Sequence, residues 1–592
     1  MVSLPLDDNS GVSTIKSYFK SLKEKASEKS KVVVAGGLAI LLTIIILFST
    51  GAIGYLKIAL QSIEDVSVCP LSEPLAPASF YKDNTTVLRI LNDEKFRLKS
   101  VQKLSGAVQI DTTIFDNQPD VSEDPKVWEK FADFHLYLQT TFPTVFALLE
   151  VEYVNTYGIV LYWKGSNKSL KPLMLTAHQD VVPVQKATLG DWSYPPFEGH
   201  YDGEYLYGRG SSDCKNVLIS IMETFELYIE EQYKPERGIV AAFGFDEEAS
   251  GIISASKLAK YLEKKFGKDS MYAIIDEGVG LIKDASTGQI VAVPGTGEKG
   301  YLDVKVNLKT PGGHSSVPPD HTSIGLMSEL AYLIEKDPYE PILTTKNPIL
   351  KYLQCSAVHS GDKLSKFTRK TILRAGFDKL ANSKVVESLT ANPLTRYLIS
   401  TAQAIDIIKG GEKANALPES VQLIVNHRIA LESSVDETKS RFVSRVKTIA
   451  SKHDLGLESF GETILEPTTK GNFVVDYSSN ALEPAPVSPS DDTVWRYLTG
   501  VVRHVFEDLV YPDLEYPIVA APGIMTGNTD TRYYWNLTKN IYRFSPFFSN
   551  DMMIENKIHS VDERVRVGAH LELTAFFYQY IQAVDTPDAD NK

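Results

Sequence analysis

Residues 172–180 have the sequence PLMLTAHQD, a short apolar run that ends in a histidine and an aspartate. Short continuous apolar runs are typical of strands that are buried on both faces of a parallel sheet. In such sheets, ligands bind beyond the carboxyl ends of the strands. We therefore expect a buried strand over residues 172–176, with His178 and Asp180 at the edge of the sheet where chemistry takes place.

Strands and helices are expected to alternate on both sides of this run. The segments 158–163, 238–245 and 271–275 are predicted strands, and 217–228 and 254–266 are predicted helices. Alternation of this kind indicates a mostly parallel sheet with helices on its faces. The predicted fold class is therefore α/β.

Five side chains that are able to bind a metal lie just after these predicted strands, before a predicted helix, or near the C-terminus. They are His178, Asp213, Glu248, Asp276 and His559, in the segments LMLTAHQD, GRGSSDCKN, AAFGFDEEASG, YAIIDEG and KIHSVDERV. Two imidazoles and three carboxylates suit a pair of zinc ions or similar divalent cations. A metal-dependent hydrolase is the leading interpretation.

Two further carboxylates suit the chemistry of such a site. Glu247 stands beside Glu248, so one glutamate can bind metal while the other takes a proton from the attacking water. Asp180 lies two residues after His178, which puts both side chains on one face of an extended segment and lets the acid accept the second ring N–H. Taken singly, such pairs are more often surface features. Their joint placement after predicted strands favours a functional role.

The hydrophobic pattern changes near residue 300. Over residues 302–308, apolar and polar residues alternate, which indicates a strand with one solvated face, and a second such stretch covers 421–430. We expect residues 298–470 to form an α+β lid domain inserted into the catalytic domain. The proline-rich segment 482–492 would lead the chain back.

A membrane anchor is predicted near the N-terminus. Residues 32–56 contain no charged side chain, and about 20 apolar residues suffice to cross a membrane as a helix. Six lysines between residues 16 and 31 precede this run, so the N-terminus is expected in the cytosol and the remainder in a lumen or outside the cell. Sequons at Asn84, Asn167 and Asn536 agree with this topology. The alternative is a buried helix of a soluble protein.

Composition limits the remaining possibilities. A net charge of -14 argues against a nucleic-acid partner, and three cysteines allow at most one disulfide bridge. The predicted organisation follows in chain order: cytosolic tail 1–31, transmembrane helix 32–56, luminal stalk 57–80, first part of the catalytic domain 81–297, inserted domain 298–470, and second part of the catalytic domain 471–592.

Seven segments resemble the motifs of one enzyme family, in that family's order. They are MLTAHQDVVPV, YGRGSSDCKN, GFDEEASG, IIDEG, TPGGHSSVPPD, KANALPE and GNTDTRYYWNL. The family is that of the di-zinc amidohydrolases, which includes aminoacylase, glutamate carboxypeptidase and succinyl-diaminopimelate desuccinylase. The resemblance spans about residues 70–585 and is nearest to anchored fungal members that reside in the vacuole.

This resemblance implies two Zn²⁺ per subunit. It assigns His178 and Asp276 to one ion, Glu248 and His559 to the other, and Asp213 to the bridge between them. The predicted fold is therefore a di-zinc hydrolase domain with an inserted lid, preceded by one transmembrane helix.

The resemblance also implies roles in catalysis and substrate binding. Glu247 would be the general base and Asp180 the acid that orients the imidazole of His178. The residues expected to contact the substrate are His314, Asn415, Arg428 and Gly527. The histidine would stabilise the oxyanion, in relatives often across a dimer interface, and the asparagine and arginine would hold the substrate carboxylate. Extra sequence over residues 336–392 leaves that dimer contact open.

Three functions remain to be weighed. The first is a membrane-anchored zinc carboxypeptidase that removes C-terminal residues from short peptides in the vacuole lumen, as a single-pass type II protein that stalk cleavage would release in soluble form. The second is an amidohydrolase or synthase of N-acyl amino acids, which also present an amide beside a free carboxylate. The third is a catalytically silent receptor, which the presence of all five ligands disfavours.

Overall fold

The computed structural model describes residues 16–17, 36–43, 56, 60, 66–550 and 552–590. The chain divides into two compact units: residues 1–64 with 366–385, and residues 65–365 with 386–592. In the smaller unit, residues 36–43 are helical. The same unit contains helix α12 (Lys366–Arg374) and the start of α13 (Lys379–Thr390). There, Arg374 forms an ion pair with Asp378 at 2.9 Å.

The predicted transmembrane helix, residues 32–56, lies for the most part outside the described residues. Within the described part of the chain, no helix combines the length and the apolar character that a membrane crossing requires. The cytosolic tail 1–31 likewise lies outside the described residues, apart from Lys16 and Ser17.

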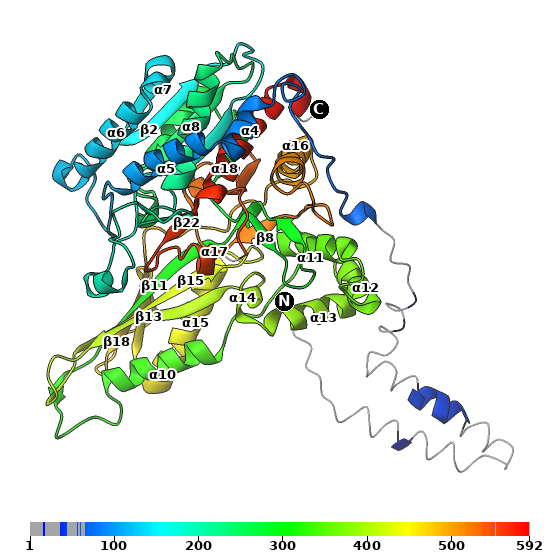
Figure 1. Ribbon diagram of the computed structural model, residues 1–592. Coiled ribbons are helices and arrows are strands. Elements are labelled where there is room, and N and C mark those ends of the chain that lie inside the picture. Colours follow the sequence, from blue (N-terminus) through cyan, green and yellow to red (C-terminus); the bar gives the residue numbers. More distant parts are fainter. Residues whose placement is uncertain are drawn as a thin grey trace. The chain divides into compact units, whose positions relative to one another are not determined.

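The larger unit is built on an eight-stranded mixed sheet (Figure 1). Its order is β1 (Glu150–Val154), β2 (Gly158–Trp163), β6 (Ile239–Gly244), β3 (Leu173–His178), β7 (Ala273–Asp276), β21 (Ile541–Arg543), β10 (Gly295–Glu298) and β20 (Gly523–Met525). The four central strands β6, β3, β7 and β21 are parallel. Strands β1 and β2 pair antiparallel with their neighbours, whereas β10 is antiparallel to β21 and parallel to β20. The predicted mostly parallel sheet is therefore parallel at its centre and mixed at its edges.

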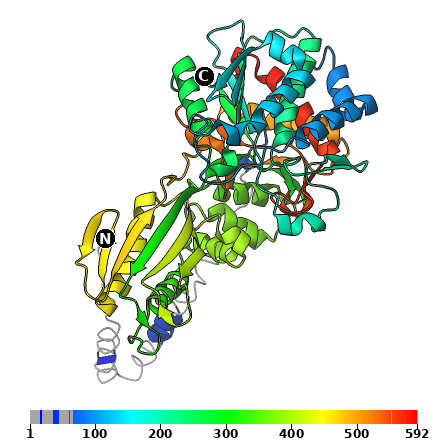
Figure 2. The ribbon, with the colours of Figure 1, turned by 90° about the vertical axis from the view of Figure 1, so that its left-hand side faces the viewer.

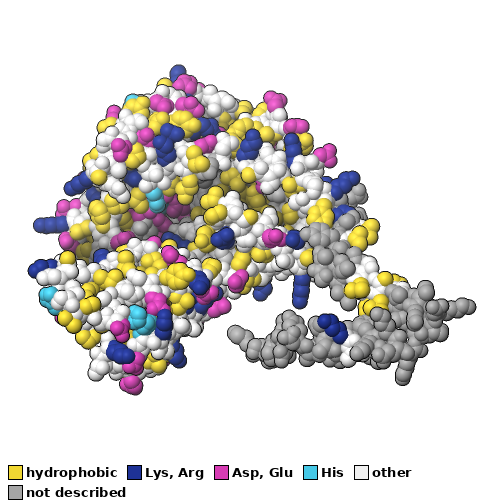
Figure 3. Space-filling model, turned by 90° about the horizontal axis from the view of Figure 1, so that it is seen from below, with side chains coloured by type: hydrophobic (Ala, Val, Ile, Leu, Met, Phe, Trp, Pro, Cys, Tyr) yellow, Lys and Arg dark blue, Asp and Glu magenta, His cyan; other side chains and the backbone are white. Residues whose placement is uncertain are grey.

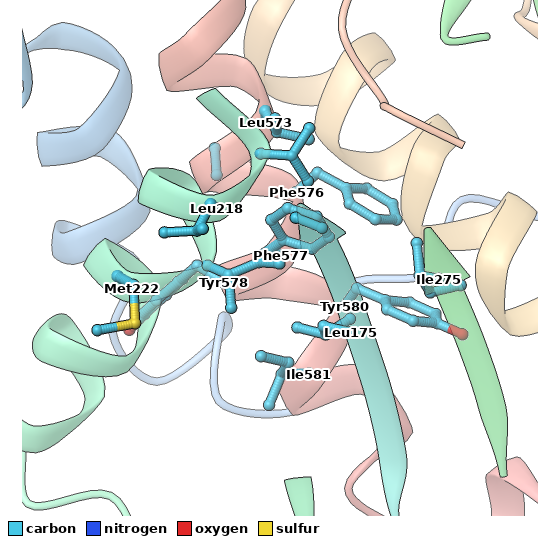
Figure 4. Packing of buried hydrophobic residues seen from close by; sticks show 14 of the residues in the cluster. Leu175, Leu218, Met222, Ile275, Leu573, Phe576, Phe577, Tyr578, Tyr580 and Ile581 are labelled. Carbon is cyan, nitrogen blue, oxygen red and sulfur yellow. The ribbon is translucent and has the colours of Figure 1, made fainter. Parts of the chain in front are cut away.

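Alternate residues of the central strands enter two different cores, one on each face. Leu173 and Leu175 of β3 belong to the large core, whereas Met174 between them belongs to the core under α9. In the large core, Leu175 and Ile275 of the sheet lie against the side chains of α18 and α8 (Figure 4). Helices on both faces explain why the strands are continuous apolar runs.

The helices of this part of the fold cover the sheet and complete the two cores. Their bounds are α4 (Thr85–Asn92), α5 (Glu94–Val108), α6 (Lys130–Thr141), α7 (Pro143–Leu148), α8 (Lys215–Glu230), α9 (Ala255–Phe266), α16 (Thr493–Arg503), α17 (Met552–Glu555) and α18 (Val567–Val584). Two three-stranded sheets flank them: β22 (Arg564–Arg566), β5 (Tyr205–Tyr207) and β4 (His200–Tyr201), and β19 (Val519–Ala520), β9 (Ile290–Ala292) and β8 (Leu281–Lys283).

A second sheet follows residue 300 and extends away from the first, in green to yellow (Figure 2). Its order is β13 (Ala402–Gly410), β15 (Ser420–Ile429), β11 (Gly300–Lys309), β18 (Asn472–Tyr477), β16 (Gly456–Ser459) and β17 (Glu462–Leu465). Helices α10 (Ser323–Lys336) and α15 (Val435–His453) pack on one face and share a core with it. The other face carries the polar residues of the alternating pattern, as on β11.

The two sheets are joined where the chain passes between them twice. Tyr301, at the start of β11, exchanges backbone hydrogen bonds of 2.9 and 2.8 Å with Leu482 of the returning segment. Farther along that segment, the N–H of Ala485 donates to the carbonyl of Glu298. A Cβ at Gly300 would lie 2.6 Å from the carbonyl oxygen of Leu482, so the close approach of these segments requires glycine there.

The inserted sequence after α10 includes α11 (Pro348–His359) and α14 (Pro393–Arg396). A disulfide joins Cys69 to Cys355 on α11, which is the one bridge that three cysteines allow. His359 and Lys351 bind the carbonyls of Cys69 and Val68 at 2.9 and 2.7 Å. The end of the predicted stalk is therefore fixed against the folded chain from residue 68 onward.

Candidate metal centre

The site begins with His178, the last residue of β3, whose side chain is 1% exposed. Its Nε2 lies 3.1 Å from Oδ1 of Asp213. Its Nδ1 lies 3.0 Å from the carbonyl oxygen and 3.4 Å from Oδ1 of Asp180. These contacts orient the imidazole, with one ring nitrogen toward the acidic cluster and the other toward Asp180.

Asp213 lies in the loop before α8 and His559 lies in a turn near the C-terminus. Nε2 of His559 is 3.1 Å from Oδ2 of Asp213 and 3.0 Å from Oε1 of Glu248. His559 has a φ of 60°, a left-handed conformation that a non-glycine residue adopts at a cost. The Asp213 carboxylate thus lies between the two imidazoles, one on each of its oxygens.

Asp180 is fully buried and makes contacts beyond His178. Its Oδ1 accepts a hydrogen bond from the backbone N–H of Glu247 at 3.2 Å, and its Oδ2 accepts one from that of Glu248 at 3.0 Å. Both glutamates lie in a short 3₁₀ turn after β6. One carboxylate therefore fixes the imidazole and the paired glutamates relative to each other.

Asp276 is the one predicted ligand that lies outside the groups of close donor atoms found in the described part of the chain. His178 and Asp213 are instead joined by Glu277, whose Oε1 lies 3.4 Å from Nε2 of His178. Asp276 is the last residue of β7 and its Oδ1 accepts the N–H of Glu277. Because neighbouring residues of an extended segment point to opposite sides, only one of these two acids faces the cluster. The geometry gives that place to Glu277, which the DEG sequence also contained.

The carboxylates of this cluster carry more negative charge than its two histidines can neutralise. Burial and the charge of Asp213 raise the pKa of Glu248 to about 7, and burial and Asp213 raise that of Glu277 to about 8. Burial raises the pKa of Glu247 well above its usual range. Burial disfavours the His559 imidazolium, but hydrogen bonds to Asp213 and Glu248 outweigh it and raise its pKa to about 10.

A buried ion pair connects the Asp213 loop to the His559 turn. Glu563 is fully buried and pairs with Arg209. Its Oε1 also accepts backbone N–H groups from three residues of the loop, Gly210, Ser212 and Asp213, at 3.0, 3.2 and 3.2 Å. No motif pointed to Glu563, although it lies four residues after His559 in KIHSVDERV.

A cavity of about 910 Å³ is lined by Asp213, Glu247, Glu248, Glu277 and His559. Figure 3 shows a hollow with acidic side chains between the parts of the fold that carry the two sheets. Arg428 and Gly527 line the cavity, as do Tyr301, Asn528 and Arg532, which the sequence analysis had not singled out as substrate contacts.

His314 and Asn415 are not among the residues that line this cavity. His314 is exposed and belongs to β12 (Gly313–His314), which pairs with β14 (Ala416–Leu417). The carbonyl of Asn415 accepts the N–H of Ser315 at 3.3 Å. These two predicted substrate contacts therefore lie together, away from the metal-binding side chains of the same chain.

The donor set fits divalent cations. In the described part of the chain, three overlapping groups of histidine and acidic side chains, one of which also includes Cys214, place their ligand atoms within 4.8 Å of one another. Crowded carboxylates with raised pKa values are stabilised when cations replace the missing positive charge. The fold and this arrangement together define the class of the protein: a metal-dependent hydrolase.

Comparison with known proteins identifies the family of hydrolases to which the chain belongs. A profile of the peptidase family M20/M25/M40 matches residues 174–583, and the chain belongs to this family. Carboxypeptidase S of Saccharomyces cerevisiae is 45% identical over 87% of this chain and 89% of its own length. The chain thus fits a fungal carboxypeptidase S, which confirms the resemblance predicted from the motifs. It is a metallopeptidase of the carboxypeptidase type.

Two further comparisons concern a relative with another named activity and a solved structure with a similar fold. An N-fatty-acyl-amino acid synthase/hydrolase of Mus musculus is 31% identical over 83% of this chain and 89% of its own length. The crystal structure of human carnosine dipeptidase 1 has a TM-score of 0.58, with 15% identity over 86% of this chain and 99% of that one. The similarity to this crystal structure shows that the two proteins share a fold.

Proposed function

We propose that this protein is a zinc carboxypeptidase that hydrolyses the C-terminal peptide bond of short peptides. The observation that carries the proposal is a single cavity that is lined both by the metal-binding side chains of Asp213, Glu248, Glu277 and His559 and by Arg428. Such a cavity suits a substrate in which an amide bond lies next to a free carboxylate, because the metal-binding side chains and the arginine lie in the same space.

In this proposal two zinc ions are held by His178, Asp213, Glu248, His559 and Glu277. When bound, they supply Lewis acidity toward the scissile carbonyl and toward water. Glu247, with its raised pKa, takes the proton of the attacking water and delivers it to the leaving amine. Asp180 holds the Glu247 backbone and the His178 ring during these transfers. Arg428 holds the carboxylate of the residue that is released.

The Glu247→Ala variant tests the assignment of the base. We expect turnover to fall by about 100- to 10,000-fold, because general acid–base catalysis contributes an amount of that order. Zinc content should stay at the wild-type level, since the neighbouring glutamate and both histidines remain. Elemental analysis and peptide hydrolysis measured on the same preparation check both outcomes; retained activity would exclude Glu247 as the base.

The alternative function is the hydrolysis or condensation of N-acyl amino acids. The mouse relative with 31% identity carries that activity in its name. Several apolar residues of the cavity wall, including Ile282, Ile524 and Phe547, would tolerate an acyl chain. Rates on N-blocked dipeptides and on fatty-acyl amino acids decide between the two: a strong preference for long acyl chains would replace the peptidase proposal.

The location proposed for the enzyme is the vacuole lumen, with residues 32–56 as a type II membrane anchor. The charge-free run and the lysines that precede it support this topology. The Cys69–Cys355 disulfide supports it as well, because disulfides persist in oxidising compartments. Glycosylation would then occur at Asn84, Asn167 or Asn536, which glycosidase treatment and a gel shift would reveal.

We also propose that residues 298–470 act as a lid and that the protein works as a homodimer. The support is the exposure of His314 and its absence from the cavity lining of its own chain. In this arrangement, His314 of one subunit would stabilise the oxyanion in the other. Mixing a Glu247→Ala chain with a His314→Ala chain tests it, because only hybrid dimers would regain a complete site.

A further inference from the structure

The cavity that contains the acidic cluster is also lined by two arginines, Arg428 on β15 and Arg532 in the 3₁₀ turn Asp530–Tyr533 that follows β20. Both are partly buried. No carboxylate in the described part of the chain lies within ion-pair distance of either guanidinium. Burial lowers the pKa of Arg428, and the positive charge of Arg532 acts in the same direction, whereas Asp303 and Glu298 act in the opposite one. Partly buried positive charges that form no close ion pair favour the binding of an anion beside them.

Arg428 is held in a fixed orientation within this wall. Its Nη1 donates to Oδ1 of Asn528 at 2.8 Å, and its guanidinium carbon lies 4.8 Å from the ring centre of Tyr301. Asn528 is itself fixed, since its Nδ2 donates to the carbonyl of Lys299 at 2.6 Å. Lys299 precedes Gly300, where the chain crosses from one sheet to the other. The direction of the Arg428 side chain is therefore tied to the junction between the sheets.

We propose that Arg532 is a second guanidinium that binds the α-carboxylate of the substrate together with Arg428, and that Asn528 is a positioning residue that aims Arg428. This inference rests on the proposed function, because it describes how the same cavity recognises a free C-terminus. A peptide that continues beyond this point places a neutral amide where the two charges favour an anion. The pair therefore makes the enzyme act at chain ends and not within chains.

Two substrates separate carboxylate recognition from hydrolysis itself: an N-blocked dipeptide with a free C-terminus and the same dipeptide as its C-terminal amide. For the full-length wild-type protein in detergent with zinc, kcat/KM is expected to favour the free acid. Arg532→Gln should lower that acid-to-amide ratio by roughly 10- to 100-fold, mainly through KM of the acid, as loss of a charge-assisted contact implies. Arg496→Gln, on the exposed side of α16, is the matched control and should leave the ratio unchanged.

Asn528→Asp tests the positioning role with little change in shape. It places a carboxylate at the atom that lies 2.8 Å from Nη1 of Arg428, where it competes with the substrate. KM for the free acid should rise about 10-fold while kcat and the amide rate stay close to wild type. A merely structural role would lower both rates together and leave the acid-to-amide ratio intact.

The results distinguish this inference from the proposed function. If Arg532→Gln keeps the wild-type ratio, or if Asn528→Asp leaves the ratio unchanged, the inference is wrong although the enzyme remains a hydrolase. If the zinc-loaded wild type cleaves neither substrate, the proposed function fails. Binding of the released amino acid, measured by calorimetry, then still tests the arginines: equal affinity of wild type and Arg532→Gln would overturn the inference.

Discussion

Among single side chains, the neighbouring acids Asp276 and Glu277 differ most clearly in whether they can bind the metal. Only Glu277 approaches His178, at 3.4 Å, whereas Asp276 accepts a backbone N–H of its neighbour. We expect Glu277→Gln to lower the bound zinc by about one ion per chain, and Asp276→Asn to retain the wild-type content. Elemental analysis after dialysis against a weak chelator measures both. The opposite pattern would restore Asp276 as the ligand.

Glu563 provides a second prediction at this scale. Its carboxylate holds three backbone N–H groups of the Asp213 loop and the Arg209 side chain. Glu563→Ala should weaken zinc affinity by roughly 10- to 100-fold, as is common when a group that orients a metal ligand is lost. Glu563→Gln, which keeps an acceptor oxygen, should recover part of the affinity. Chelator competition measures zinc affinity directly, and an unchanged value in the alanine variant would exclude the positioning role.

The sequence predicted much of the site because His178 and Glu248 follow strand ends and Asp213 lies just before a helix. His178, Asp213, Glu248 and His559 do lie together, and Asp180 contacts His178. Which acid of the DEG sequence faces the cluster depends on the rotation of the chain as it leaves β7, and apolar periodicity does not encode that rotation. The contacts of Glu563 and Arg532 depend on segments that meet only after folding.

At the scale of elements, β15 carries a histidine that makes stability depend on pH. Burial, together with the positive charge of Arg445 on α15, lowers the pKa of His427 to about 4, although Asp303 and the hydrogen bond to Leu302 act in the opposite sense. The ring donates from Nδ1 to the carbonyl of Leu302, and its Nε2 has no partner in the described structure. The folded chain therefore keeps this imidazole neutral.

In the unfolded chain the same histidine binds a proton below about pH 6.5. The unfolded state therefore gains protons between pH 6.5 and 4 while the folded state does not, so stability falls as the pH drops through that window. From pH 7 to pH 5 the loss from this group is about 2 kcal/mol. Urea midpoints at both pH values should show that His427→Gln is less sensitive to acid than wild type. Equal sensitivity of the two proteins would contradict the prediction.

Among the elements, those with strong periodicity were predicted best. The predicted strand 158–163 coincides with β2, and the predicted helix 254–266 is close to α9. Residues 125–148 form a short turn followed by α6 and α7, with Pro143 at the start of α7. Short strands such as β21 carry too few residues for a periodic signal, and only pairing with β7 and β10 defines them.

For the whole molecule, the Cys69–Cys355 bridge should contribute to stability. It joins residues 286 positions apart, so it restricts the unfolded chain over a long loop. The Cys69→Ser/Cys355→Ser double variant should lose roughly 2–5 kcal/mol of unfolding free energy and unfold at a lower temperature. Alkylation of the unfolded, unreduced protein should modify only Cys214, and reduction should expose all three thiols. Three reactive thiols before reduction would show that the bridge is absent.

The position of β21 has a consequence for biosynthesis. This strand lies between β7 and β10 in the middle of the eight-stranded sheet, yet it begins at Ile541. During synthesis, the edges of β7 and β10 that face β21 therefore remain unpaired until nearly the entire polypeptide has been made. Exposed strand edges of this kind promote aggregation. A premature stop codon before position 541 should consequently yield chains that are degraded or aggregated, instead of a shortened enzyme.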